Sequence, residues 1–364
     1  MSDTGAKLTA SIRISLAIAT KDITDAIKNR TILSLLLALV FTMLTAQALP
    51  LLLKLSDVSQ VIVFDAGDSQ LVTELDKSEQ YRLIQADSQQ EMEEILTTMS
   101  GEALGLAVPA GFDELLVAGG KPELDGYVVW ENRSAAAGLK ADTERHLQDL
   151  LGQPVLIHVE GNVLYPPPEG GGRLGMVATV MVLIPMVIGA MLVPYLMFEE
   201  KQAHTIEVLL VSPASIGQIV SGKALAGLFY VVAAMAVVFI FTYSTIAYWG
   251  IAILAALCGA ILFIGVGLVL GSIFDSPQAM GLWVVLPFLL LLLPMVVDTV
   301  GASVPEPLAA AFPWLPTVAL AKVFLLSFSG EASLGRALPH LVIVLAWAAP
   351  LYLVLLWLLG RSDR

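Results

Sequence analysis

The chain has 364 residues, of which 57% are hydrophobic and 14% are charged, and its mean hydropathy is +0.81. Because soluble domains carry about 25% charged residues, this composition excludes an ordinary soluble protein and places most of the chain in lipid. The formal net charge of −13 excludes a basic surface of the kind that binds nucleic acid.

Lys, Arg, Asp and Glu are missing from five long apolar stretches. A spanning helix needs ~20 apolar residues, and the longest stretch, 224–274, has room for two spans with a turn near 248–250. The sequence therefore predicts a polytopic α-helical membrane protein with six transmembrane helices, at 31–53, 174–198, 219–245, 250–273, 278–298 and 338–360.

The first 30 residues are predicted to form an amphipathic helix. Their apolar residues recur at three- and four-residue steps, at Ile12, Leu16, Ala19, Ile23 and Ile27, which is the spacing of one helical face. Such a helix can lie in the membrane interface or pack on a neighbour as a soluble helix.

The apolar run at 31–53 has two interpretations. Ala46-Gln47-Ala48 looks like the small-residue cleavage site of a signal peptide. However, a polar lead of 30 residues precedes the run, which continues through Leu53. Both features favour an uncleaved first span.

Residues 54–173 contain 21 acids and 8 bases, so the net charge of −13 belongs entirely to this segment. Short β-rich runs alternate with helical runs here, which predicts an α/β domain with a mostly parallel or mixed sheet. The prolines and glycines of 165–172 form a linker to the second span. Strands are expected at 61–64, 81–84, 104–108, 127–130 and 155–159, and helices near 69–77, 88–100, 111–118 and 134–151.

Lys and Arg in short flanks predict the orientation. Five bases precede the first span, Lys201 and Lys223 lie between the second and third spans, and Arg361 and Arg364 follow the last. With six spans, all of these bases fall on one side of the membrane. The prediction is a multi-pass protein of the cell membrane with both termini cytoplasmic and an extracellular α/β domain inserted between helices 1 and 2.

A polar insert at 199–223 interrupts the apolar half of the chain. Ile206, Leu209 and Leu210 form a small apolar group on a polar stalk, which suits docking of a helix in a groove of a partner. Ser212-Pro213 is a helix-start signal, with serine as N-cap and proline at the first helical position. A plain solvated loop is the alternative.

Two spacings near this insert suggest sites that the rest of the sequence argues against. Glu200, His204 and Glu207 share one helix face at ligand-like spacing, but nothing else in the chain supplies further ligands, so no metal site is predicted. Residues 217–224 nearly match a phosphate-binding loop but end in alanine instead of Ser or Thr. Lys223 in this run is interpreted as an interfacial anchor.

The predicted spans have no acid or base in mid-membrane, where ion-coupled carriers usually place ionisable residues. This pattern favours an outside source of energy, such as an ATPase partner. The connection 299–337 contains four prolines and a predicted short helix at 317–327. The residues that can line a pathway, each also suited to an interhelical hydrogen bond, are Thr42, Thr45, Gln47, Thr179, Thr242, Tyr243 and Gln278.

The insert resembles the cytosolic loop of ABC-2-type permeases, the membrane subunits of ATP-driven ABC transporters. That family's pattern is an acidic residue followed, after a few positions, by Gly-Thr, any residue, Glu, any residue and Leu-Leu, with Pro soon after. His204 stands where the family usually has Gly. The matching residues here are Glu199 or Glu200, Thr205, Glu207, Leu209, Leu210 and Pro213.

The resemblance implies a plan for the whole chain and favours the interfacial position of the first helix. The implied regions are a cytoplasmic or interfacial helix at 1–30, a first span at 31–53, an extracellular domain at 54–173, and a five-helix region at 174–364 that contains a cytosolic coupling loop at 199–218 and an external re-entrant-type segment at 299–337. The implied docking residues are Glu200, Thr205, Ile206, Glu207, Leu209, Leu210, Ser212 and Pro213.

By this resemblance the chain is a non-catalytic permease subunit, an exporter by the family's usual direction, with no cofactor of its own. Its expected partners are an ABC ATP-binding subunit that carries ATP and Mg, a second permease copy or sister permease, and the lipid bilayer. Permeases of this type handle lipids, hydrophobic drugs, peptides or sodium ions. The alternative is a membrane-anchored ligand-binding or signalling protein that acts through its ectodomain, and six spans count against it.

Overall fold

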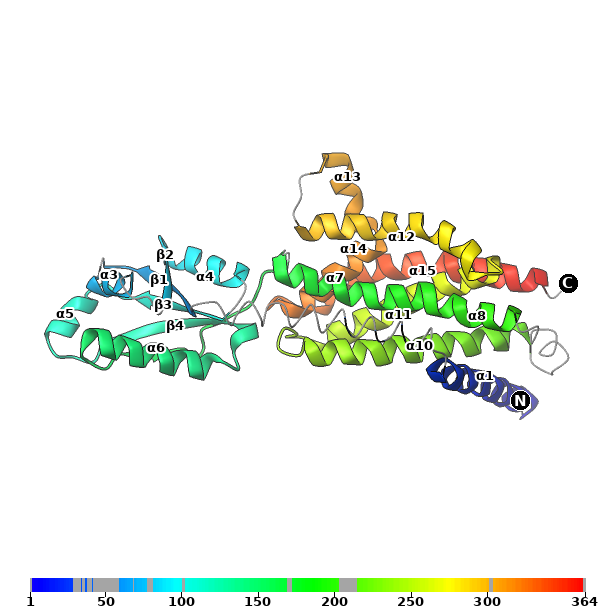
Figure 1. Cartoon of the computed structure of the whole chain (residues 1–364), viewed down its shortest axis with the longest axis horizontal. Coiled ribbons are helices and arrows are strands. Elements are labelled where there is room, and N and C mark those ends of the chain that lie inside the picture. Colours follow the sequence, from blue (N-terminus) through cyan, green and yellow to red (C-terminus); the bar gives the residue numbers. More distant parts are fainter. Residues whose placement is uncertain are drawn as a thin grey trace.

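The computed structural model describes residues 2–28, 34, 37, 41, 59–67, 69–76, 81–99, 102–168, 172–202, 215–300 and 304–362. These residues form a bundle of long apolar helices and an α/β domain that lies beyond one end of the bundle (Figure 1). Helix α1 (Ser2–Lys28) and the C-terminal end of the last helix lie at the other end.

Six strands form the mixed sheet of the α/β domain, in the order β2-β1-β3-β4-β5 with β6 beside β4. Strands β2, β1 and β3 are mutually parallel, β4 is antiparallel to β3, and β5 and β6 pair in parallel with different stretches of β4. This sheet confirms the predicted α/β segment. The strands are β1 (Ser59–Asp65), β2 (Tyr81–Ala86), β3 (Ala103–Val108), β4 (Glu123–Val129), β5 (Leu156–His158) and β6 (Val163–Leu164).

Successive residues of β1 show which helices cover each face of the sheet. Val61 and Val63 belong to one apolar cluster with α3 and α6, whereas Ile62 belongs to another with Met92 of α4. Because both faces of β1 are buried, its sequence is a continuous apolar run instead of an alternating one. The helices are α3 (Gln70–Asp76), α4 (Gln89–Thr98), α5 (Phe112–Val117) and α6 (Ala136–Leu151).

Four stretches of the bundle are long and apolar enough to cross a membrane, at Leu174–Phe198, Gly217–Phe241, Trp249–Ile273 and Leu334–Leu358. They agree with four of the predicted spans. The helices that contain them are α7 (Gly172–Val187) continuing through a π-helical segment, η2 (Ile188–Leu192), into α8 (Val193–Gln202), then α10 (Ile216–Phe241), α11 (Trp249–Ile273) and α15 (Leu334–Ser362).

The other two predicted spans are not established in the same way. Helix α12 (Pro277–Val300) covers 278–298, but it contains Pro287 and Pro294, and only Pro287–Asp298 stands out as a shorter apolar helix. The predicted first span, 31–53, lies almost entirely outside the described residues. The number of six spans therefore stays a prediction.

A bent pair of helices connects α12 to α15. The stretch Glu306–Trp314, which holds α13 (Glu306–Ala311), meets α14 (Pro316–Phe328) at an angle of 73°. Pro316 is the first residue of α14, a position where the missing N–H of proline costs nothing. Helix α14 confirms the short helix predicted at 317–327, and it contacts α7, α11, α12 and α15.

Helix α11 lies at the centre of the bundle, where it contacts α15, α10, α14 and the α7–η2–α8 helix. Gly267 lies against the backbone of Gly189, and Gly271 lies against Met197. Small residues at such crossings let helix backbones approach closely, which is the main packing device in lipid. Pro194, just after η2, has no N–H to donate to the preceding turn, and this accounts for the local widening into a π-helix.

Candidate functional site

All of the predicted docking residues except Glu200 fall in the sequence between the end of α8 and the start of α10. Glu200 lies in α8. The flanking ends of α8 and α10 lie at the end of the bundle that is opposite the α/β domain (Figure 1). The other docking residues lie outside the described residues: Thr205, Ile206, Glu207, Leu209, Leu210, Ser212 and Pro213.

A capping box starts α10 and also attaches α1. The Ser215 hydroxyl accepts from the Gln218 N–H at 3.3 Å, and Gln218 Oε1 accepts from the Ser215 N–H at 2.9 Å. Ser215 is thus the N-cap of α10, and the helix start predicted at Ser212-Pro213 lies outside the described residues. Gln218 Nε2 donates to Ser11 Oγ at 3.0 Å, and Ser15 Oγ donates to the Gln218 carbonyl at 3.3 Å.

Lys223 of α10 joins three helices in the interior of the protein. Its side chain is only 2% exposed, and its Nζ lies 3.2 Å from Oδ2 of Asp22 in α1. The same ammonium donates to the carbonyl of Leu196 in α8 at 2.9 Å. A buried charge is tolerated when it is paired and hydrogen-bonded in this way. The interpretation of Lys223 as an interfacial anchor is therefore wrong, because α1 supplies it with a carboxylate inside the fold.

Helix α1 rests on α10 through a narrow stripe of small and polar residues. Ser15, Ala19 and Asp22 are buried at steps of four and three residues, so they lie on one face. The Tyr230 hydroxyl of α10 donates to the carbonyl of Ile23 at 2.8 Å. Together with Lys223, these contacts hold α1, α8 and α10 as one unit, which we call the foot of the bundle.

Most of the predicted apolar face of α1 is not used in this packing. Ile12, Leu16 and Ile27 are each at least half exposed, whereas Ala19 from the same predicted face is buried on α10. Helix α1 therefore has one side fixed to the bundle and an adjacent apolar side that is exposed, and its position in the membrane interface stays a prediction.

The candidate pathway residues that the structure describes do not gather in one place. Thr242 and Tyr243 follow α10 at the end near the α/β domain, whereas Gln278 is exposed in the first turn of α12 at the other end. The Thr242 hydroxyl donates to the Val238 carbonyl of its own chain segment at 2.9 Å. Thr179 is partly buried in α7. Outside the described residues lie Thr42, Thr45 and Gln47.

Sequence analysis missed the pairing of Lys223 with Asp22. The two residues are 201 positions apart, so no local spacing connects them. The available signal was a lysine at the edge of a long apolar stretch with no acid nearby in the sequence. Such a residue needs a partner from a distant segment if it is buried.

The α/β domain has open polar hollows of about 380 and 370 Å³. One is lined by Tyr81 of β2 and by residues of α6 that include Asp142 and Arg145. Burial raises the pKa of Tyr81 above its ordinary value, opposed by a hydrogen bond with Thr143. In the part of the chain that the structure describes, no group of three or more His, Cys, Asp or Glu could hold a metal ion.

Four helical stretches are apolar and long enough to span a membrane, the described flanks of the polar insert lie at one end of them, and the α/β domain lies at the other. These features define a polytopic membrane protein. A family model described as "ABC-2 family transporter protein" matches residues 30–358. The chain therefore belongs to the ABC-2 family, and it is a permease-type membrane subunit of an ABC transporter. This confirms the resemblance found in the polar insert. Comparison with curated proteins and with solved structures gives no match.

Proposed function

We propose that this chain couples ATP hydrolysis on a partner ABC ATPase to movement of a substrate out of the cytoplasm. The coupling loop, 199–218, would dock in a cleft of the ATPase through Glu207 and the apolar group of Ile206, Leu209 and Leu210. Helix-in-groove docking of this kind needs a short apolar face on a polar helix, and the residues of the loop provide one.

The observation that carries this proposal is the foot of the bundle. The described end of the coupling loop begins α10 at Ser215, and the Lys223 contacts to Asp22 and Leu196 follow within the next turns. A push on the loop therefore acts on α1, α8 and α10 together, because buried polar contacts join them. If the loop were attached only to a frayed helix end, the same displacement would unfold that end locally and would not move the helices.

The arrangement of the ends of the chain supports the proposed orientation. Helix α1, the flanks of the coupling loop and the end of α15 lie at one end of the bundle, and the α/β domain lies at the other (Figure 1). This is the arrangement expected of a permease with cytoplasmic termini and an extracellular domain. Two permease copies, or one copy with a sister permease, would form the pathway between them, and ATP and Mg would bind only on the ATPase.

The test of this proposal is the substitution Glu207→Ala in the complex of permease and ATPase reconstituted in liposomes. We expect ATP-driven flux to fall at least tenfold, as loss of one buried hydrogen-bonded charge at an interface costs about 2–5 kcal/mol. Flux is measured with a lipid, a hydrophobic dye, a peptide and sodium ions as separate probes. Membrane insertion of the variant is measured in parallel and should match the wild type.

The matched control is Asp25→Ala, which removes an exposed acid from α1 at the same end of the bundle. This control should transport at the wild-type rate. Equal flux in Glu207→Ala and wild type would contradict the role of Glu207, and equal loss in both variants would show that general surface charge, rather than docking, is responsible.

A further inference from the structure

The α/β domain rests on two turns of the bundle through specific contacts. One turn, 242–248, joins α10 to α11, and the other, 329–333, joins α14 to α15. On the domain side, the contacts come from the residues just after β4 and just after β6. Because β4 and β6 pair side by side in parallel, both strands deliver their following residues to the same place.

Arg133 forms the main polar contact with the first turn. Its Nη1 donates to the Ser244 carbonyl at 2.7 Å and to the Trp130 carbonyl at 2.8 Å, and its guanidinium carbon lies 3.9 Å from the centre of the Trp130 ring. Hydrogen bonds from an ionised donor are shorter and stronger than neutral ones, and stacking on an indole adds a cation–π attraction. Trp130 of its own domain thus holds the Arg133 guanidinium in place while the same group bonds to the Ser244 carbonyl of the bundle.

A second pair of residues supports the same turn. The Thr245 hydroxyl lies 3.4 Å from Oε1 of Glu131, which belongs to the short helix η1 (Trp130–Asn132). Glu131 and Arg133 therefore contact consecutive residues of the turn, so the domain is attached to it at two points.

Tyr165 makes the contact with the second turn. Its ring stacks on Trp130, with ring centres 5.0 Å apart and planes at 21°. On the bundle side the ring covers Gly330 so closely that a Cβ atom there would lie 2.9 Å from the ring. Glycine at this position is what lets the aromatic ring reach the backbone of the turn.

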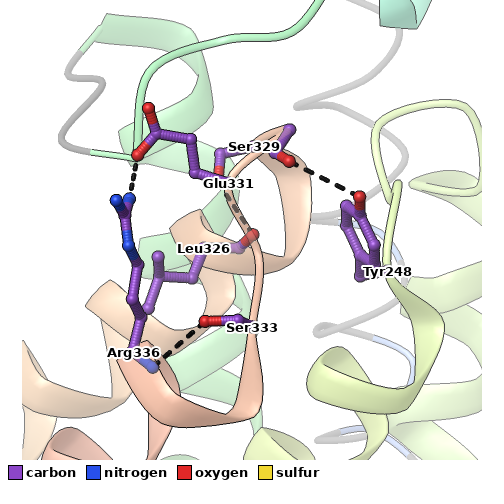
Figure 2. Close-up of polar contacts among 7 residues, drawn as sticks. Tyr248, Leu326, Ser329, Glu331, Ser333 and Arg336 are labelled. Carbon is purple, nitrogen blue, oxygen red and sulfur yellow. Dashed lines mark hydrogen bonds and ion pairs between the residues drawn. The ribbon is translucent and has the colours of Figure 1, made fainter.

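The two turns are also joined to each other. The N–H groups of Ala247 and Tyr248 both donate to the Ser327 carbonyl, at 3.0 and 2.9 Å. The Tyr248 hydroxyl donates to the Gly330 carbonyl at 3.4 Å (Figure 2). The second turn is tied to the start of α15, where Glu331 pairs with Arg336 and the Arg336 N–H donates to Ser333 Oγ (Figure 2). The domain thus rests on one connected platform.

We propose that Trp130, Glu131, Arg133 and Tyr165 form a rigid joint through which the α/β domain and the outer ends of α10, α11, α14 and α15 move as one body. A proline- and glycine-rich linker alone would let the domain swing freely, whereas attachment to two separate turns, at 244–245 and at Gly330, resists rotation. If the proposed function holds, tilting of these helices during the ATP cycle also moves the domain. By reciprocity, anything that the domain binds biases the state of the bundle.

Hydrogen exchange of the full chain in lipid nanodiscs tests whether the joint is rigid. In Arg133→Ala we expect exchange of the 242–248 amides to rise about tenfold, as a charge-assisted hydrogen bond is lost. Gly330→Ala changes the joint from the bundle side and should raise exchange of the 163–165 amides, which precede three prolines. The control Arg145→Ala removes an exposed arginine that pairs with Asp142 within α6 and should change neither segment. Wild-type exchange in both joint variants would overturn the inference.

A second comparison tests whether the joint transmits motion, using the complex with the ATPase, without nucleotide and trapped with ATP and vanadate. We expect trapping to change exchange in 123–133 of the wild type and to leave these amides unchanged in Arg133→Ala. The same change in both proteins, or none in a wild-type complex that hydrolyses ATP, would overturn transmission. If no ATPase associates with the chain, the proposed function fails, while the nanodisc comparison still decides whether the joint is rigid.

Discussion

Lys223 and Asp22 show how a single ion pair can organise the foot of the bundle. The two side chains are 2% and 6% exposed, and the lysine also donates to the Leu196 carbonyl. A buried pair of this kind contributes little net stability compared with well-packed apolar residues, but removing one partner is costly. The pair therefore fixes which face of α1 lies on α10.

Replacing Lys223 with methionine should lower stability by about 3–5 kcal/mol, because Asp22 loses its buried cation. The fall is measured as a lower midpoint of thermal unfolding of the purified protein in detergent. The double variant Lys223→Met with Asp22→Leu should recover most of the loss. The control is Lys28→Met, which removes an exposed lysine from α1, the helix that carries Asp22. A double variant as unstable as the single one would refute the pairing.

At the scale of elements, α11 depends on glycine to approach the α7–η2–α8 helix. Gly267 and Gly271 face this helix, and Gly259 faces Leu320 of α14. A side chain at Gly267 would meet the Gly189 carbonyl, which belongs to the π-helical segment. At Gly267 the crossing is therefore fixed mainly by the backbones themselves, with no flexible side chain at that point that could move aside.

Gly267→Ala should destabilise the protein by about 1–3 kcal/mol, because overpacking a close helix crossing forces the backbones apart. Gly250→Ala is the matched control, since it lies on the same helix and a Cβ atom there meets nothing within 4 Å. Both variants are compared by thermal unfolding in the same detergent. Equal midpoints for the two would contradict the close crossing.

The organisation of the whole molecule was largely predictable from local patterns in the sequence. Charge-free stretches indicated the helices that contain Leu174–Phe198 and Trp249–Ile273, since length and apolarity are local properties. The sequence patterns that predict the strands and helices of the α/β domain are equally local. The two-residue strand β6 was missed because Val163 and Leu164 pair with β4 only through tertiary structure.

Contacts between distant segments were not predictable in this way. Lys223 meets Asp22, and Arg133 meets the Ser244 carbonyl, only after the helices and the domain have packed. The pathway residue Thr242 was proposed from polarity alone, and its hydroxyl is satisfied by the Val238 carbonyl. The docking residues from Thr205 to Pro213 stay a prediction, because they lie outside the described residues.

The central claim at the scale of the whole molecule is that this permease works with an ABC ATPase through its coupling loop. The most direct measurement is gentle affinity purification of the chain from its own cells, with quantitative mass spectrometry of the proteins that accompany it. We predict an ABC ATPase in amounts comparable to the chain, lost when Leu209 and Leu210 are both replaced by Asp. An ATPase that is absent under conditions that preserve other membrane complexes, or one that is retained by the double aspartate variant, would contradict this account.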